Sequence, residues 1–219
     1  MSAPALSVVV PVRDGERWLD EALDSIAAQD LPAAEVIVVE DGSQDRSEVL
    51  ARARAFVTVV PGPRSGVAAA YQAGFDAVSG DAVLTIGQDD RFADGAFRAM
   101  ADALERSPAA GYVRGMVQLF TDEPGHFDGL RADRLDRPYA ARAPEAVAIR
   151  TEILRRFPLD PRVSTAWDVD LFLRLEDAGV PMADVDALVA FKRLRPDSTI
   201  HATRDAQAAT LAAVRASIA

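Results

Sequence analysis

Two adjacent carboxylates, Asp89 and Asp90, follow an apolar run at residues 82–86. The run is rich in β-branched residues and has no polar alternation, which predicts a strand buried on both faces. The carboxylates then lie at the carboxyl end of that strand, where open α/β sheets bind their ligands. Two neighbouring carboxylates there can hold a divalent cation against a phosphate. The alternative is an acidic cap on the helix that begins near Asp94.

A second acidic pair, Glu40 and Asp41, follows another apolar run at residues 35–39. We expect both pairs at the same edge of the sheet, because the carboxyl ends of parallel strands meet there. The turn Asp41-Gly42-Ser43 offers a carboxylate that can accept a hydrogen bond from a base or a ribose. An ordinary Asx turn with a polar cap for the next helix explains the same residues.

A third carboxylate, Asp168, falls in the first turn of an amphipathic helix predicted over residues 167–178. Leu171 and Leu175 share one buried face of this helix. The helix dipole favours an ionised carboxylate at its start. Asp168 is therefore either a chemical group or a routine helix-start acid, with Arg174 pairing with a neighbouring acid.

The elements that must position these carboxylates alternate between strand and helix in the first 90 residues. Such alternation predicts an α/β fold with parallel strands and right-handed crossovers. The predicted strands are 6–12, 35–39, 57–60 and 82–86, and the predicted helices are 15–29, 44–56 and 67–78.

The second half of the chain is less regular, and residues 121–144 read as a long polar loop over a site. No linker separates two units, so we expect a single domain over residues 1–219. We expect helices at 94–105, 151–156, 167–178 and 205–217, and strands at 111–120, 146–149 and 188–193.

The composition narrows the possible partners. The net charge of −10 argues against non-specific binding to nucleic acid or to an anionic membrane surface. There are no cysteines and only two histidines, which excludes thiolate chemistry and leaves little for a zinc site. The sequence has no signal-peptide pattern and no transmembrane-length apolar run, so we expect a soluble, cytoplasmic protein.

Taken together, five stretches in this order resemble the family 2 glycosyltransferases, which have the GT-A fold, a Rossmann-like and mostly parallel sheet flanked by helices. Gln88-Asp89-Asp90 stands at that family's Asp-x-Asp position, and Trp167-Asp168 with Leu171 and Arg174 is similar to its Glu-Asp-x-x-Leu-x-x-Arg motif. The other three stretches are residues 8–12 as the opening strand, 38–45 as the second-strand motif, and 66–74 with Gly80-Asp81 before the metal motif.

The resemblance implies an inverting transfer of a sugar from a nucleoside-diphosphate donor to an acceptor hydroxyl. It implies that residues 1–93 form the nucleotide-sugar-binding half and residues 94–219 the acceptor side. Asp168 would be the general base, and Mg²⁺ or Mn²⁺ would be held by Asp90 and Asp89. The nucleotide sugar would contact Pro11, Val12, Asp41, Gln88, Asp89 and Arg195.

Several positions depart from the family pattern. Gly87 stands where the family often has an Asp, Glu40 replaces an Asp, and Trp167 replaces a Glu. Tyr71-Gln72 replaces a common Arg-Asn pair. Arg195 stands where a late segment often carries a metal-binding His; an Arg can bind a diphosphate directly but cannot ligate a cation.

These departures keep other hypotheses open. The first alternative is a catalytically impaired protein of this fold that binds a nucleotide sugar or a partner protein. A nucleotidyltransferase ranks last, because Val12-Arg13-Asp14-Gly15 lacks the glycine-rich, basic loop it would need. The acceptor is not specified by the sequence, and the alanine-rich helix at 205–217 either supports a homodimer or simply packs on the domain.

Overall fold

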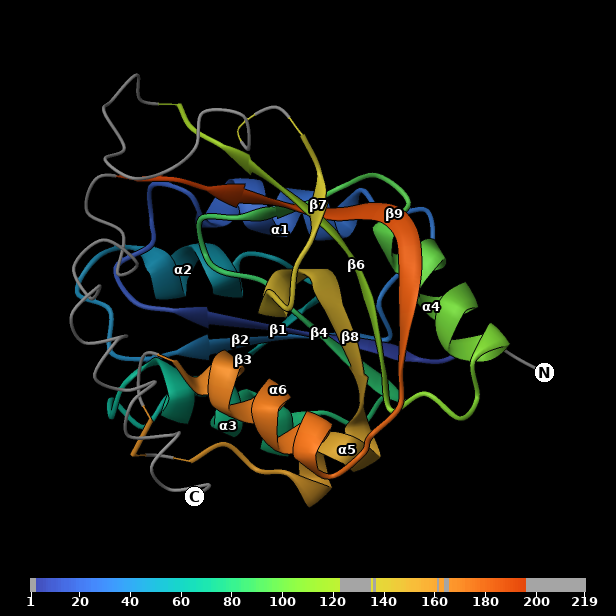
Figure 1. The fold of residues 1–219 in the computed structure, drawn as a ribbon. Coiled ribbons are helices and arrows are strands. Elements are labelled where there is room, and N and C mark those ends of the chain that lie inside the picture. The colour runs from blue at the N-terminus through green and yellow to red at the C-terminus, as the bar shows by residue number, and fades with distance from the viewer. Residues whose placement is uncertain (1–2, 123–134, 136, 161, 164–165, 196–219) are drawn as a thin grey trace.

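One mixed β-sheet forms the centre of the molecule (Figure 1). The computed structural model describes residues 3–122, 135, 137–160, 162–163 and 166–195. Its strand order is β3-β2-β1-β4-β8-β6-β9-β5, with β7 paired to β6. The strands are β1 (Leu6–Val12), β2 (Glu35–Glu40), β3 (Val57–Pro61), β4 (Ala82–Thr85), β5 (Arg91–Phe92), β6 (Tyr112–Phe120), β7 (Tyr139–Ala140), β8 (Val147–Arg150) and β9 (Met182–Arg193).

The first four strands of the order are parallel, as the alternation of strands and helices predicts. Beyond β4 the sheet is mixed: β8 runs antiparallel to both β4 and β6, while β9 runs parallel to β6. The helices are α1 (Leu19–Ala27), α2 (Ser47–Arg52), α3 (Val67–Ala77), α4 (Ala96–Arg106), α5 (Thr151–Arg156) and α6 (Trp167–Asp177), with a 3-10 turn η2 (Pro144–Ala146).

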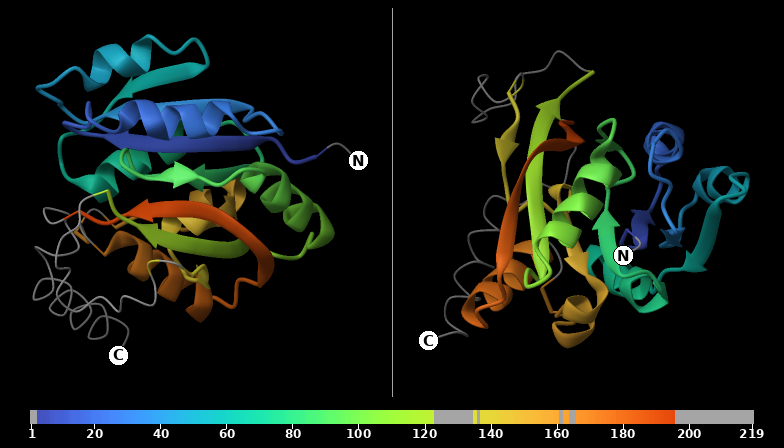
Figure 2. Two further views of the ribbon diagram at one scale, coloured as in Figure 1. Left: turned by 90° about the horizontal axis from the view of Figure 1, so that it is seen from above. Right: turned by 90° about the vertical axis from the view of Figure 1, so that its right-hand side faces the viewer.

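Helices cover both faces of the sheet, and each face has its own core (Figures 1 and 2). Val8 and Val10 of β1 belong to the core with α1, α2 and α4, whereas Val9 belongs to the core with α3, α5 and α6. Because successive side chains of a strand point to opposite faces, a strand between two cores is apolar at every position. This explains the absence of polar alternation in the sequence of β1.

Helix α3 approaches the sheet closely at Gly74. A Cβ at this position would lie 2.3 Å from Cγ1 of Val9 and 3.1 Å from Cγ2 of Val39. The absence of a side chain therefore lets the helix backbone lie directly on β1 and β2, which is a packing role rather than a conformational one.

Some predicted boundaries were wrong. Helix α2 begins at Ser47 rather than at residue 44, because Asp45 accepts hydrogen bonds from the N–H and hydroxyl of Ser47 in a non-helical turn. Strand β9 begins at Met182, six residues before its predicted start; in this part Val185 is buried between the exposed Asp184 and Asp186. The predicted loop 121–144 contains the short strand β7, and the predicted helix 205–217 lies outside the described residues.

Candidate active site

The loops that follow β1 and β2 are joined to each other at the carboxyl edge of the parallel strands. Asp14 N–H donates to Ser43 Oγ (3.1 Å), and Gln44 N–H donates in return to Asp14 Oδ1 (2.7 Å). Gly15 N–H donates to Ser47 Oγ at 2.8 Å, where the bond is buried. These reciprocal bonds fix the two loops as one surface beside the strand ends.

Gln88 joins the loop after β4 to the same surface. Its Oε1 accepts from Arg13 N–H (2.8 Å), and its Nε2 donates to Arg13 C=O (3.0 Å). Both polar atoms of the Gln88 amide are thus hydrogen-bonded to the backbone of Arg13. The predicted contact between Gln88 and a nucleotide sugar stays a prediction, and the bonds present give this residue a positioning role.

Asp41 follows β2 and lies between the end of β1 and the loop after β3. Its side chain is buried, and its Oδ1 accepts from Arg64 N–H at 2.6 Å. Its own N–H donates to Val12 C=O at 2.8 Å, which joins the Asp41 backbone to the end of β1, whereas the carboxylate faces the loop after β3. The backbone of Gly62 closes over it, since a Cβ there would lie 2.5 Å from Asp41 Oδ1.

Glu40, the neighbour of Asp41, caps the turn that follows β2. Burial alone would raise its pKa, but hydrogen bonds from Ser43 and from the Gly42 N–H outweigh burial and lower the pKa of this carboxyl. Glu40 is therefore ionised at neutral pH and stabilises the turn by accepting hydrogen bonds from the Gly42 and Ser43 N–H groups.

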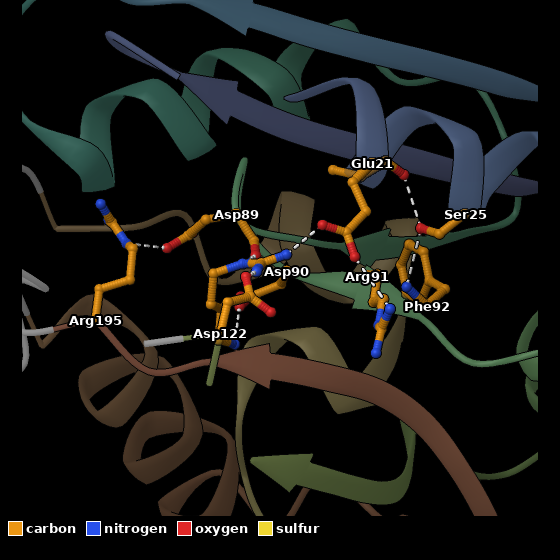
Figure 3. Close-up of polar contacts among 10 residues, drawn as sticks. Glu21, Ser25, Asp89, Asp90, Arg91, Phe92, Asp122 and Arg195 are labelled. Atoms are coloured by element: carbon orange, nitrogen blue, oxygen red, sulfur yellow. Dashed lines mark hydrogen bonds and ion pairs between the residues drawn. The ribbon is translucent and has the colours of Figure 1, made fainter. Parts of the chain in front are cut away.

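Asp89 and Arg195 form an ion pair at the edge of the site (Figure 3). Arg195 Nε donates to Asp89 Oδ2 at 2.7 Å, and its guanidinium lies 4.2 Å from the centre of the Trp18 ring. The backbone carbonyl of Asp89 accepts from Arg193 Nε at 2.8 Å. The end of β9 is thereby attached to the loop after β4, and Arg195 lies beside Asp89; its predicted contact with a diphosphate stays a prediction.

Asp90, the neighbour of Asp89, is buried and faces the ammonium group of Lys192. Its Oδ1 accepts from Arg193 N–H (2.8 Å), and its Oδ2 lies 3.7 Å from Lys192 Nζ. Lys192 also donates to Glu145, whose side chain is 3% exposed. Burial raises the pKa of Asp90 to about 7; the ammonium of Lys192 opposes this, and the carboxylates of Glu145 and Asp89 add to it.

Lys192 is held in its charged form. Burial would lower its pKa, but the carboxylates of Glu145 and Asp90 outweigh burial and raise the pKa well above its usual value. Sequence analysis missed both Lys192 and Glu145 as site residues. The only sequence signal for Lys192 is its place three residues before Arg195 in the late motif, and Glu145 has no such signal.

Asp168 lies in the first turn of α6 and is half-buried. Burial raises its pKa; the Val169 N–H acts against this and the Glu145 carboxylate adds to it. Glu145 and Lys192 shift the pKa of both Asp168 and Asp90, so the two predicted site carboxylates belong to one electrostatic cluster.

Tyr71 and Trp167, two of the departures from the family pattern, pack on each other beside this cluster. Their ring centroids are 4.3 Å apart, and both side chains are buried. Burial raises the pKa of Tyr71, and the charges of Glu145 and Asp168 contribute to the rise, so its hydroxyl remains protonated. The stack fixes the residue that precedes Asp168.

Basic side chains compete with a divalent cation for the carboxylates of Asp89 and Asp90. A Cβ on Gly87 would lie 2.8 Å from Asp90 Oδ2 and 3.2 Å from Asp89 Oδ1, so two carboxylate oxygens do face one point. Yet Asp89 and Asp90 each pair with a fixed side-chain cation. In the described part of the chain, no group of three His, Asp or Glu side chains can hold a metal ion. Mg²⁺ bound together with a substrate phosphate needs only one or two protein carboxylates, but here it would compete with Lys192 and Arg195 for both of them.

Residues 7–155 match the model of glycosyl transferase family 2, and the chain belongs to this family. Its fold is the GT-A fold of glycosyltransferases. Among curated relatives, the uncharacterized glycosyltransferase EpsJ of Bacillus subtilis is 29% identical over 108 residues, which are 48% of this chain and 31% of EpsJ. The chain therefore matches only about a third of the length of that relative.

Two examples show the likeness to solved structures. Glucosyl-3-phosphoglycerate synthase of Mycobacterium tuberculosis, in complex with Mn²⁺, UDP and glucosyl-3-phosphoglycerate, has a TM-score of 0.70 at 22% identity over 96% of this chain and 80% of that chain. The mannosyltransferase PcManGT of Pyrobaculum calidifontis, in complex with GDP-Man and Mn²⁺, has a TM-score of 0.69 at 20% identity over 93% of this chain and 61% of that chain. No helix within the described residues is long and apolar enough to cross a membrane.

Proposed function

We propose that this protein transfers a sugar from a nucleoside-diphosphate donor to an acceptor hydroxyl with inversion of configuration. The observation that carries the proposal is the group of ion pairs after β4, where Asp89 pairs with Arg195 and the buried Asp90 lies 3.7 Å from Lys192 Nζ. Lys192 also pairs with Glu145, and the charges of Glu145 and Lys192 act on Asp168. Family membership supports the same chemistry, and the solved relatives named with UDP and GDP-Man support a nucleotide donor.

In the proposed reaction, Asp168 removes the proton of the acceptor hydroxyl. The hydroxyl oxygen forms a bond to the anomeric carbon while the bond from that carbon to the diphosphate breaks, so the nucleoside diphosphate leaves with the electron pair. Pro11, Val12 and Asp41 are proposed to hold the base and ribose, and Asp89 and Arg195 to face the diphosphate. Residues 1–93 thus supply the nucleotide contacts, and the segment 94–219 supplies the base and the cations.

The sequence predicts Mg²⁺ or Mn²⁺ on Asp90 and Asp89. The Mn²⁺ named in both solved relatives supports it, and the pairing of the two carboxylates with Lys192 and Arg195 counts against it. The proposed transfer does not depend on this ion.

The test is to incubate the protein with UDP-, GDP- and dTDP-sugars and a panel of sugar and lipid-linked acceptors, and to measure released nucleoside diphosphate. Turnover that requires an acceptor and is lost in Asp168→Asn is the expected result. The matched control is Arg98→Gln, which removes an exposed ion pair to Asp30, beyond the C-terminal end of α1, whereas the site contacts the start of that helix. Donor binding without turnover for any acceptor would favour the non-catalytic alternative.

A further inference from the structure

Three carboxylates stand where the diphosphate of the proposed donor would lie: Asp89, Asp90 and Glu145. A diphosphate carries at least two negative charges, so three unneutralised carboxylates would repel it strongly. In this family of folds a divalent cation is one way to offset such charge. The structure contains another, because two basic side chains of the same strand end, Lys192 and Arg195, lie among these carboxylates.

Lys192 is the inner cation. Its side chain is 26% exposed, whereas those of its partners Glu145 and Asp90 are 3% and 5% exposed. The ammonium therefore lies at the open end of a buried acidic pair, where it can contact a ligand without leaving its partners. An ammonium is a compact point charge with three donors, which suits a phosphate oxygen.

Arg195 is the outer cation. Its Nε donates to Asp89, its guanidinium plane lies over Trp18, and its side chain is 18% exposed. Stacking and the ion pair together restrict the guanidinium to one place, so little conformational entropy remains to be lost on binding. A guanidinium fixed in this way matches the planar, bidentate geometry that phosphate binding needs.

We propose that Lys192 and Arg195 together take the place of the divalent cation, so that this protein binds the diphosphate of its donor without a metal ion. This rests on the proposed function, since it concerns the same donor site. Lys192 is at the end of β9 and Arg195 follows that strand directly. The contacts of Arg193 with Asp89 and Asp90 attach this segment to the loop after β4. The end of β9 therefore supplies positive charge at the place where the sequence resemblance implies a metal-binding His.

The experiment measures binding of UDP, GDP and uridine to the full chain by calorimetry, with EDTA or with Mn²⁺. We expect the diphosphates to bind equally well in both. Arg195→Gln and Lys192→Gln should each weaken diphosphate binding by about 10- to 100-fold, the value of a charged hydrogen bond, and leave uridine binding unchanged. Arg98→Gln is the control and should behave as the wild type.

Two further variants keep the test decisive. Lys192→Arg retains the charge and should retain most of the affinity, so a folding defect of Lys192→Gln would not hide the answer. Arg195→His should bind diphosphate poorly in EDTA and regain affinity with Mn²⁺, because an imidazole beside Asp89 supplies the third ligand for the ion.

The outcomes separate this inference from the proposed function. Diphosphate binding by the wild type only with Mn²⁺, or wild-type affinity of Arg195→Gln in EDTA, would overturn the inference and leave sugar transfer intact. No binding of any nucleoside diphosphate under either condition would overturn the proposed donor site itself.

Discussion

At the scale of single residues, Asp168 is the residue on which the proposed chemistry depends. Asp168→Asn keeps the size and shape of the side chain and removes its basicity. We expect kcat to fall by about 10²- to 10⁴-fold, the usual contribution of a general base, while donor affinity stays unchanged. Steady-state kinetics with a calorimetric measurement of donor binding checks this. Loss of donor affinity in the variant would instead assign Asp168 to substrate binding.

The raised pKa of Asp168 gives the reaction a pH dependence. A general base must be deprotonated, so kcat should be low below the pKa of Asp168 and rise as the pH passes through it. Because the pKa is above that of an ordinary aspartate, the rise should lie at higher pH than about 4. A profile of kcat against pH at saturating donor measures this rise. A kcat that does not change with pH above about 4 would contradict the assignment of Asp168 as the general base.

The same shift also affects stability. The folded state binds the Asp168 proton more tightly than the unfolded state, so this group favours folding at low pH and loses that contribution as the pH rises through its folded pKa. Asp168→Asn should therefore unfold at a higher temperature than the wild type at pH 8, with the difference disappearing below about pH 4. Calorimetric melting at both pH values measures the difference. A lower melting temperature of the variant at pH 8 would show that the carboxylate is stabilised by its neighbours.

At the scale of elements, the contact of α3 with the sheet can be tested at Gly74. Gly74→Ala should lower the free energy of unfolding by about 1–3 kcal/mol, because the new methyl group would overlap Val9 Cγ1. Val9→Ala removes the overlapping group and should cost about the same through a cavity. In the double variant the alanines fit together, so its loss should be smaller than the sum of the two. Urea denaturation measures this cycle, and strict additivity would contradict the close approach.

At the scale of the whole molecule, strands β1, β2, β4, β6 and β8 each contribute buried side chains to both cores, so the two cores should unfold together. The chain has two tryptophans: Trp167 packs in the core with α3 and α6, and Trp18 lies at the start of α1 on the other face. The single-tryptophan variants Trp18→Phe and Trp167→Phe should each show a fluorescence transition in urea that coincides with their own circular dichroism transition. Separate midpoints would show that the two layers unfold independently.

Much of this architecture was predictable because its causes are local. Uniformly apolar runs such as 6–12 and 35–39 predict strands buried on both faces, and the alternation with helices predicts parallel pairing. The positions of Asp41, Asp89 and Asp168 in the fold follow from the same elements. Local pattern could not place β9 beside β6, some 70 residues away, nor bring Lys192 onto Glu145, since such pairings depend on the packing of the complete sheet.

Gly87 leaves no room for a side chain beside the buried carboxylate of Asp90. A Cβ at this position would come within 2.8 Å of Asp90 Oδ2. Gly87→Asp would therefore force Asp90 away from Lys192 and add a negative charge beside Asp89 and Asp90. An acid at position 87 is thus compatible with this site only if the pairing of Asp89 and Asp90 with Arg195 and Lys192 changes with it.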